Sequence, residues 1–288
     1  MVSLELVVTA IISGVLTGGL YALLAIGTNL IVGIVHIINL AQGDFAMLGM
    51  FTVFWLFVLF NITPLLSLPL AFVLLFVVGY LLAKFVFARV FGLPEIYTVL
   101  LTYGLELVIM NGAQVVWSGD YRRVDVAYPD YVYGPISVSG EYLIAFIFAT
   151  VLSFVLYTVL VKTKLGKAIR AVSQDPDASA IVGINVGKIR AITTGIGIGL
   201  AGAGGAILAI VYYIYPYVGS LFTITAILIC VLGGLGNVKG AYFGALILGL
   251  VQSLSVLFLP YGLKDAVGFA VFILVLVLRP EGLFGSGG

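Results

Sequence analysis

The chain contains several uncharged stretches that are too long for the core of a soluble domain. The runs 6–43, 45–83 and 191–238 contain no Asp, Glu, Lys or Arg, and 96–119 contains a single acid, Glu106. A helix that crosses a bilayer needs about 20 apolar residues, so some of these runs can hold two crossings. Only 9% of the 288 residues are charged, against about 25% in soluble domains. The main solvent of the folded chain is therefore lipid.

These runs predict an all-α polytopic membrane protein with about eight or nine transmembrane helices. Residues 1–288 are expected to form a single transmembrane domain. The first run lacks a preceding basic patch, so we expect a retained span and not a cleaved signal. The last run is short, and we expect it to borrow residues 261–263, with Lys264 extending outward to water. The predicted spans are 6–27, 44–60, 64–83, 96–117, 142–161, 191–213, 221–236, 241–259 and 266–279.

Basic residues predict the orientation, because short cytoplasmic loops collect Lys and Arg. The loop 162–190 is the most basic segment, and alternating the spans outward from it divides the 13 basic residues ten to three. The minority on the outer side comprises Arg122, Arg123 and Lys264. We therefore expect the loop 162–190 and the C-terminus in the cytoplasm, and the loop 118–141 outside.

Small residues are frequent, with 36 glycines in the chain. Gly195 and Gly199, and likewise Gly240 and Gly244, are four residues apart, which allows two helices to approach closely in lipid. The segment 28–43 is apolar but rich in Gly and Asn, so we expect it to be re-entrant or interrupted.

Four polar residues are candidates for a solute pathway. Asn39, Gln42 and Asp44 surround the expected interruption, and Glu106 is the only acid in the middle of a span. Polar groups in membranes need partners and often mark pathways, and interrupted helices offer free backbone groups to a solute. Two other interpretations remain open: an interfacial turn with Asp44 in water, and Glu106 as a hydrogen-bonded packing group. We expect His36 to be a packing histidine.

The loop 162–190 contains a helix-start signal in which Asp175 precedes Pro176. We expect a short amphipathic helix over 177–184 that docks on a soluble partner. A plain charged connector is the alternative. At the other side of the membrane, the tyrosine-rich stretch 212–217 is expected at the outer interface. It serves there as an aromatic belt or as a docking surface for a binding protein.

Four stretches carry a resemblance to a known family. The loop resembles the ATPase-coupling loop of ABC importer permeases for branched-chain amino acids, with the matching positions at Arg170, Asp175, Pro176, Asp177, Ala178 and Gly183. NLAQGDFAMLG at 39–49, GGLGNVKGAYFG at 233–244 and LRPEGLFG at 278–285 resemble three further family segments. The chain is most similar to the first of the two Liv-type permeases. Many relatives have His where Gln42 stands, so no titratable role is expected there.

The resemblance implies a permease subunit in the inner membrane. It implies pairing with a second homologous permease, two cytoplasmic ATPase subunits and an extracytoplasmic substrate-binding protein. The chain itself is then not an enzyme and needs no cofactor, metal or nucleic acid. The stretch 183–189 differs from a phosphate-binding P-loop, because its glycines have the wrong spacing and Ile189 replaces the Ser/Thr.

Two alternatives remain open from the sequence. A urea or short-amide importer would share the same architecture. An ion-coupled secondary transporter would use Asp44 or Glu106 for coupling and would work without ATPases.

Overall fold

The computed structural model describes residues 4–126, 128–134 and 136–285, and nearly all regular structure in them is helical. Within these ranges, eight helices are long and apolar enough to cross a membrane, which confirms the expected all-α polytopic membrane protein. They are α1 (Leu4–Val35), α2 (Gln42–Phe60), α3 (Pro64–Phe85), α4 (Glu95–Trp117), α5 (Gly140–Lys162), α8 (Val186–Val211), α10 (Val238–Ser255) and α11 (Lys264–Leu278).

The remaining elements are short. The predicted seventh span is the apolar helix α9 (Val218–Gly233), which has 16 residues. The 3-10 turns η1 (Phe87–Arg89) and η2 (Tyr261–Leu263) extend α3 and α11, as expected for residues 261–263. The others are α6 (Lys164–Gln174), α7 (Pro176–Ile181), and the antiparallel strands β1 (Tyr131–Tyr133) and β2 (Ile136–Val138).

Helix α8 is the centre of the molecule and is buried along most of its length. Its glycines let neighbouring backbones approach: a Cβ on Gly195 would meet Phe76 of α3 at 3.1 Å, and one on Gly199 would meet Phe72 at 3.1 Å. Gly205 lies directly on the carbonyl of Ala46 in α2. These contacts confirm the expected close helix approach and place it inside this chain.

Helix α1 is longer than predicted, because it continues through Gly27 and Gly33. Both glycines permit close packing and do not end the helix: Gly27 lies against the carbonyl of Gly197, and Gly33 against Gly236. The interruption lies at residues 36–41, which turn back into the protein before α2 begins. His36 stands at the turn with φ 54° and is exposed, so the expected packing role is wrong.

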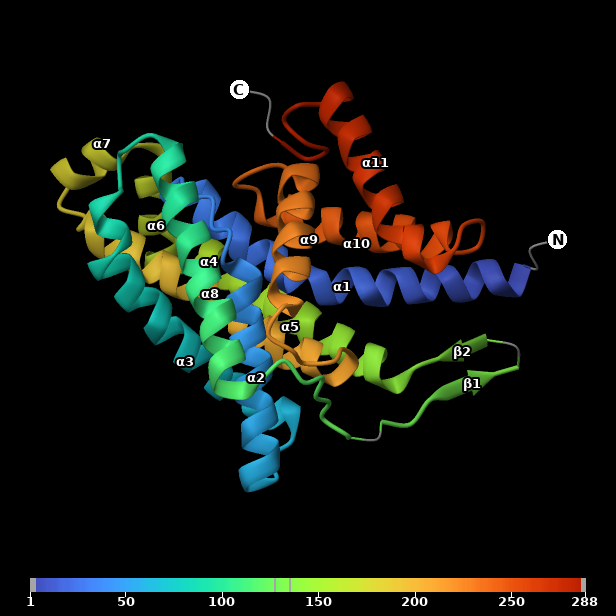
Figure 1. Cartoon of the computed structure of the whole chain (residues 1–288). Coiled ribbons are helices and arrows are strands. Elements are labelled where there is room, and N and C mark those ends of the chain that lie inside the picture. Colours follow the sequence, from blue (N-terminus) through green and yellow to red (C-terminus); the bar gives the residue numbers. More distant parts are fainter. Residues whose placement is uncertain (1–3, 127, 135, 286–288) are drawn as a thin grey trace.

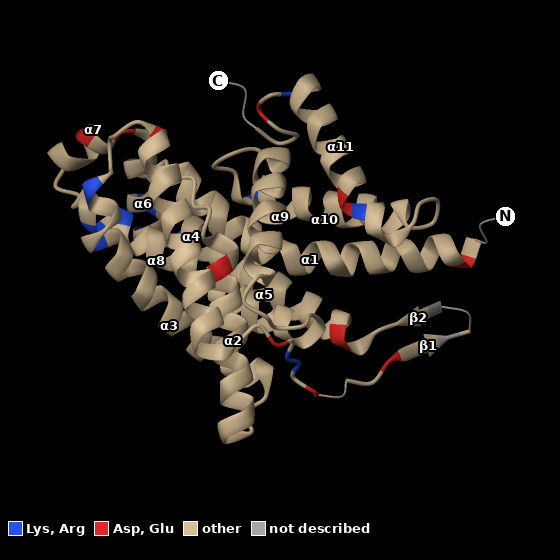
Figure 2. Cartoon of the chain, viewed as in Figure 1, with Lys and Arg blue, Asp and Glu red and all other residues tan. Residues whose placement is uncertain are grey.

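The molecule has two chemically different ends (Figures 1 and 2). We call the end with α6, α7 and the start of α8 the basic end, where most blue segments of the ribbon gather in Figure 2. We call the opposite end, with β1 and β2, the hairpin end. Helix α1 connects them, since its start packs beside β2 and Ser173 of α6 donates to the carbonyl of Gly33 at 2.8 Å.

Candidate functional site

Three of the predicted pathway residues lie together inside the protein, and we call Asn39, Gln42 and Asp44 the inner polar cluster. All three have 0% exposed surface. The amide of Asn39 donates to Oε1 of Gln42 at 3.0 Å, and Nε2 of Gln42 donates to the carbonyl of Gly197 at 3.0 Å. Through these bonds the side chains of Asn39 and Gln42 hold the chain reversal at residues 36–41 against α8.

Helix α9 supports the same cluster from another direction. The Thr223 hydroxyl donates to the carbonyl of Leu40 at 3.0 Å and accepts from the N–H of Gly43 at 2.8 Å. The first turn of α2 is therefore hydrogen-bonded to the first half of α9. Both helices begin inside the protein, close to one another.

Asp44 differs from its neighbours because neither carboxylate oxygen has a hydrogen-bond partner within the described residues. It lies in the first turn of α2, and Gly219 in the first turn of α9 packs directly against its side chain. Two helix N-termini near a carboxylate contribute about 1–2 kcal/mol. Burying an ionised carboxylate costs several kcal/mol. A polar partner at Asp44 would therefore lower the free energy of this site.

Glu106 lies on α4, near enough to Asp44 for the two carboxylates to interact electrostatically. Its side chain is half-buried, and it makes no hydrogen bond within the described part of the chain. Helix α4 buries little beyond Thr98, Thr102 and Ala113. Thr102 ties it to the chain reversal by donating to the carbonyl of Ile38 at 3.0 Å.

The predicted coupling residues gather at the basic end. Asp175 caps α7 by accepting from the N–H of Ala178 at 2.9 Å, with Pro176 at the first position of the helix and Asp177 exposed after it. Arg170 of α6 donates to the carbonyl of Leu160, which fixes α6 against the end of α5.

The helix in this loop is shorter than the predicted 177–184. Helix α7 ends at Ile181 because Gly183 has φ 87°, and the N–H of Ile184 returns to the carbonyl of Ser179 at 3.0 Å. This ending leaves Ile181 86% and Val182 75% exposed. An apolar tip therefore projects from the most basic surface of the molecule.

The structure also contains a cavity of about 480 Å³ at the hairpin end that the sequence did not predict. We call it the outer cavity. Its walls come from α1, the start of α5, the end of α10 and the start of α11, and many of its side chains carry hydroxyl groups. The polar members are Thr9, Ser13, Thr17, Ser137, Ser139, Tyr142, Tyr212, Gln252, Ser253, Tyr261 and Lys264.

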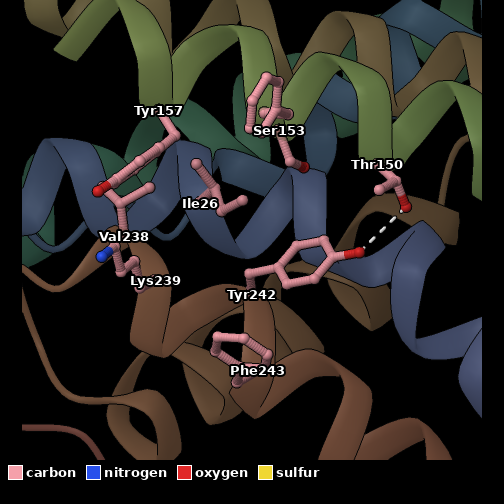
Figure 3. Close-up of a pocket in the computed structure, with 9 residues that line it drawn as sticks. Ile26, Thr150, Ser153, Tyr157, Val238, Lys239, Tyr242 and Phe243 are labelled. Atoms are coloured by element: carbon pink, nitrogen blue, oxygen red, sulfur yellow. Dashed lines mark hydrogen bonds between the residues drawn. The ribbon is translucent and has the colours of Figure 1, made fainter. Parts of the chain in front are cut away.

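A smaller cavity of about 190 Å³ lies near the basic end between α1, α5 and α10 (Figure 3). Its walls are largely apolar, with Ile26, Val238 and Phe243 among them. Thr150 of α5 and Tyr242 of α10 point toward each other, with their hydroxyl oxygens 3.1 Å apart. This hydrogen bond holds α5 to α10 beside the cavity.

Comparison with known proteins identifies the family. A family described as "Branched-chain amino acid transport system / permease component" matches residues 10–276. The high-affinity branched-chain amino acid permease protein BraD of Pseudomonas aeruginosa is 29% identical over 290 residues, covering 96% of this chain and 94% of the relative. LivH of Escherichia coli, described in the same words, is 30% identical over 298 residues, covering 95% and 94%.

A second type of permease also matches. The probable branched-chain amino acid transport permease protein LivM of Methanocaldococcus jannaschii is 28% identical over 172 residues, covering 51% of this chain and 48% of the relative. No solved structure matches the chain. The family match spans all eight membrane-crossing helices in whole or in large part. The chain is thus a multi-pass transport subunit and not an enzyme, and it belongs to the family of permease components of branched-chain amino acid transport systems.

Proposed function

We propose that this chain is one transmembrane subunit of an ATP-driven importer that carries leucine, isoleucine and valine across the inner membrane. The observation that carries this proposal is the match to high-affinity branched-chain amino acid permeases over nearly the whole chain. The other parts are a second homologous permease, two cytoplasmic ATPase subunits and an external substrate-binding protein. The partial similarity to LivM supports a paired permease of related sequence.

The proposed orientation places the basic end in the cytoplasm. Six of the basic side chains surround α6, α7 and the start of α8, in accord with the positive-inside rule. The tail after α11 lies at the same end, because the N–H of Leu283 donates to the carbonyl of Leu232 at the end of α9 at 2.8 Å. The hairpin end then faces the external binding protein.

The segment 162–190 is proposed to couple the subunit to an ATPase. The support is the apolar tip at Ile181 and Val182, which is exposed although it belongs to a compact, well-capped pair of helices. Exposed apolar side chains rimmed by polar ones are typical of protein–protein contacts. A groove in the ATPase subunit is the proposed partner of this tip.

The inner polar cluster and Glu106 are proposed to face the solute during transport. Asp44 supports this role, because it is buried without a hydrogen-bond partner in the described structure and would gain one from the ammonium group of an amino acid. Helix α4 covers the cluster but is itself little buried. Displacement of α4 would give a solute access to Asp44.

Reconstitution tests the function. The chain, a second permease, two ATPases and a binding protein are placed in liposomes, and uptake of labelled leucine, isoleucine, valine, urea and short amides is measured. We expect ATP-dependent uptake of the three amino acids, and no uptake by this chain alone. Accumulation of urea with no amino-acid uptake would leave the family assignment unchanged but would show that the proposed substrate is wrong. Uptake that collapses with the proton gradient at constant ATP would favour a secondary transporter.

A further inference from the structure

The outer cavity has a polar lining that a lipid-facing surface would not have. Thr9, Ser13, Thr17 and Tyr21 are four residues apart along α1, which places them on one face of the helix. The hydroxyls of Ser13 and Thr17 make no hydrogen bond within the described residues. A hydroxyl left unpaired in an apolar environment costs roughly 2–7 kcal/mol, so this face is stable only against water or a polar ligand.

The charged side chain in the lining of the outer cavity is basic. Lys264 lies half-buried in its wall, where Nζ donates to the hydroxyl of Tyr261 at 2.9 Å. No acidic side chain lies within 4.0 Å of this ammonium group among the described residues, and none lines the cavity there. Asp265 instead accepts from Nε2 of Gln252 at 3.1 Å. The ammonium group of Lys264 is therefore available to an anion.

Tyr212 lines the cavity, and Tyr21 is hydrogen-bonded to it from behind the lining. The hydroxyl oxygens of Tyr21 and Tyr212 are 3.0 Å apart and hydrogen-bonded, and Tyr21 is only 6% exposed. The ring of Tyr212 packs edge-on against Phe222 of α9, with ring centroids 5.6 Å apart. The next residue, Thr223, bonds the backbone of Leu40 and Gly43, which are chain neighbours of the inner polar cluster. The Tyr21–Tyr212 pair thus lies between the outer cavity and the elements that hold Asp44.

We propose that the outer cavity is the first binding site of the solute on this subunit, and that Lys264 binds the carboxylate group of the solute there. This proposal rests on the proposed function. The hydroxyl groups of α1 and Gln252 hydrogen-bond the head group, and the apolar walls contact the side chain. A volume of about 480 Å³ accommodates an amino acid with several waters. The Tyr21–Tyr212 pair closes the cavity toward the inner polar cluster until the helices move.

Thiol labelling tests whether the cavity is open to water. Cys230 is buried and is replaced by Ser, and Thr17→Cys and Val15→Cys are made separately in the full importer. Both positions are half-exposed and lie at the same depth, but only Thr17 lines the cavity. An impermeant maleimide should modify Thr17→Cys at least about tenfold faster, because thiolates form in water and not in lipid. Equal rates at the two positions would overturn the open cavity.

Protection by the solute tests the binding role without the binding protein present. Millimolar leucine should slow the labelling of Thr17→Cys, whereas leucinamide, which lacks the carboxylate, should protect far less. Lys264→Gln should weaken leucine protection by about tenfold, as expected for one charge-assisted hydrogen bond. Lys84→Gln, in the last turn of α3 and away from the cavity lining, is the matched control and should leave protection unchanged.

The outcomes separate this proposal from the proposed function. If the reconstituted importer takes up leucine but leucine never protects Thr17→Cys, the first-site role is wrong and the function stands. If urea protects and is transported while leucine does neither, the substrate is wrong and the cavity remains a binding site. If Lys264→Gln preserves full leucine protection, the carboxylate contact is wrong.

Discussion

At the scale of single residues, glycine decides how closely α2 and α9 meet, because it has no side chain. Gly43 of α2 lies on the backbone of α9, and Gly219 of α9 lies on Asp44. The hydrogen bond from Gly43 to Thr223 forms only at this short separation. Each glycine is therefore required by close backbone packing within a helix, and neither adopts a left-handed conformation.

Gly219→Val should destabilise the protein, since its added atoms would collide with Asp44. We expect a loss of about 3 kcal/mol, typical of severe overpacking, and a lower thermal unfolding midpoint in detergent. Gly104→Ala is the control, because no atom lies within 4 Å of the position its Cβ would take. That change should be neutral or stabilise α4 by up to about 1 kcal/mol. Equal midpoints for the two variants would contradict the close packing.

Asp44→Asn tests the unpaired carboxylate. Asn has nearly the same shape, so we expect the assembled importer to fold, while ATP-dependent leucine uptake falls by at least about tenfold if Asp44 contacts the solute ammonium group. Asp125→Asn is the control, since its side chain is 88% exposed in the loop 118–141. Normal uptake by Asp44→Asn would remove Asp44 from the pathway and leave it a structural role.

At the scale of elements, apolar length could be read from the sequence, but helix ends could not. The interruption was expected within 28–43 because of its glycines. It lies at 36–41, where His36 takes a left-handed conformation and Asn39 turns the chain. Glycine signals a helix end in water, whereas in α1 it signals close packing with α8 and α10. The same ambiguity made the first span too short.

The helices of the loop 162–190 also show which features could be predicted from the sequence. The Asp-Pro start predicted the cap of α7 correctly, since this signal depends on neighbouring residues alone. The end of α7 was placed three residues too late, because Gly183 ends the helix by its positive φ and not by its position in an apolar pattern.

Ile181→Glu should weaken coupling without affecting folding. Its side chain is exposed, so the new charge is tolerated by the subunit but is costly in an apolar contact with an ATPase. We expect ATPase activity stimulated by the binding protein to fall at least about tenfold, as for a disrupted interface hot spot. Ile181→Leu keeps an apolar side chain at the same exposed position and should leave the stimulation unchanged. Unchanged stimulation in Ile181→Glu would place the ATPase contact elsewhere.

At the scale of the whole molecule, the inner polar cluster could be predicted from the sequence more readily than the outer cavity. Asn39, Gln42 and Asp44 stand out because they interrupt an apolar run. The outer cavity is built from separate segments, and its hydroxyl groups hardly change the mean hydropathy. Its one local trace is the four-residue spacing of Thr9, Ser13 and Thr17, which is also compatible with helix packing. Lys264 was expected to extend outward, but it lies in the cavity wall.

Labelling of single cysteines tests the orientation of the molecule. Asp125→Cys and Asp177→Cys are made in a Cys230→Ser background, and both positions are exposed. In intact cells, an impermeant reagent should modify position 125 and not position 177. After permeabilisation both should react. Modification of position 177 alone in intact cells would invert the proposed orientation.

The segment that follows α11 constrains the order in which parts of the protein can fold. Residues 282–285 lie against the loop 234–237, and Asn237 donates to the carbonyl of Phe284 at 2.7 Å. The same loop is bound from the other side by Asn29, which donates to the carbonyls of Gly234 and Asn237. The loop that leads into α10 is therefore held between a residue of α1 and a segment that follows α11, and it can take its final position only after both have folded.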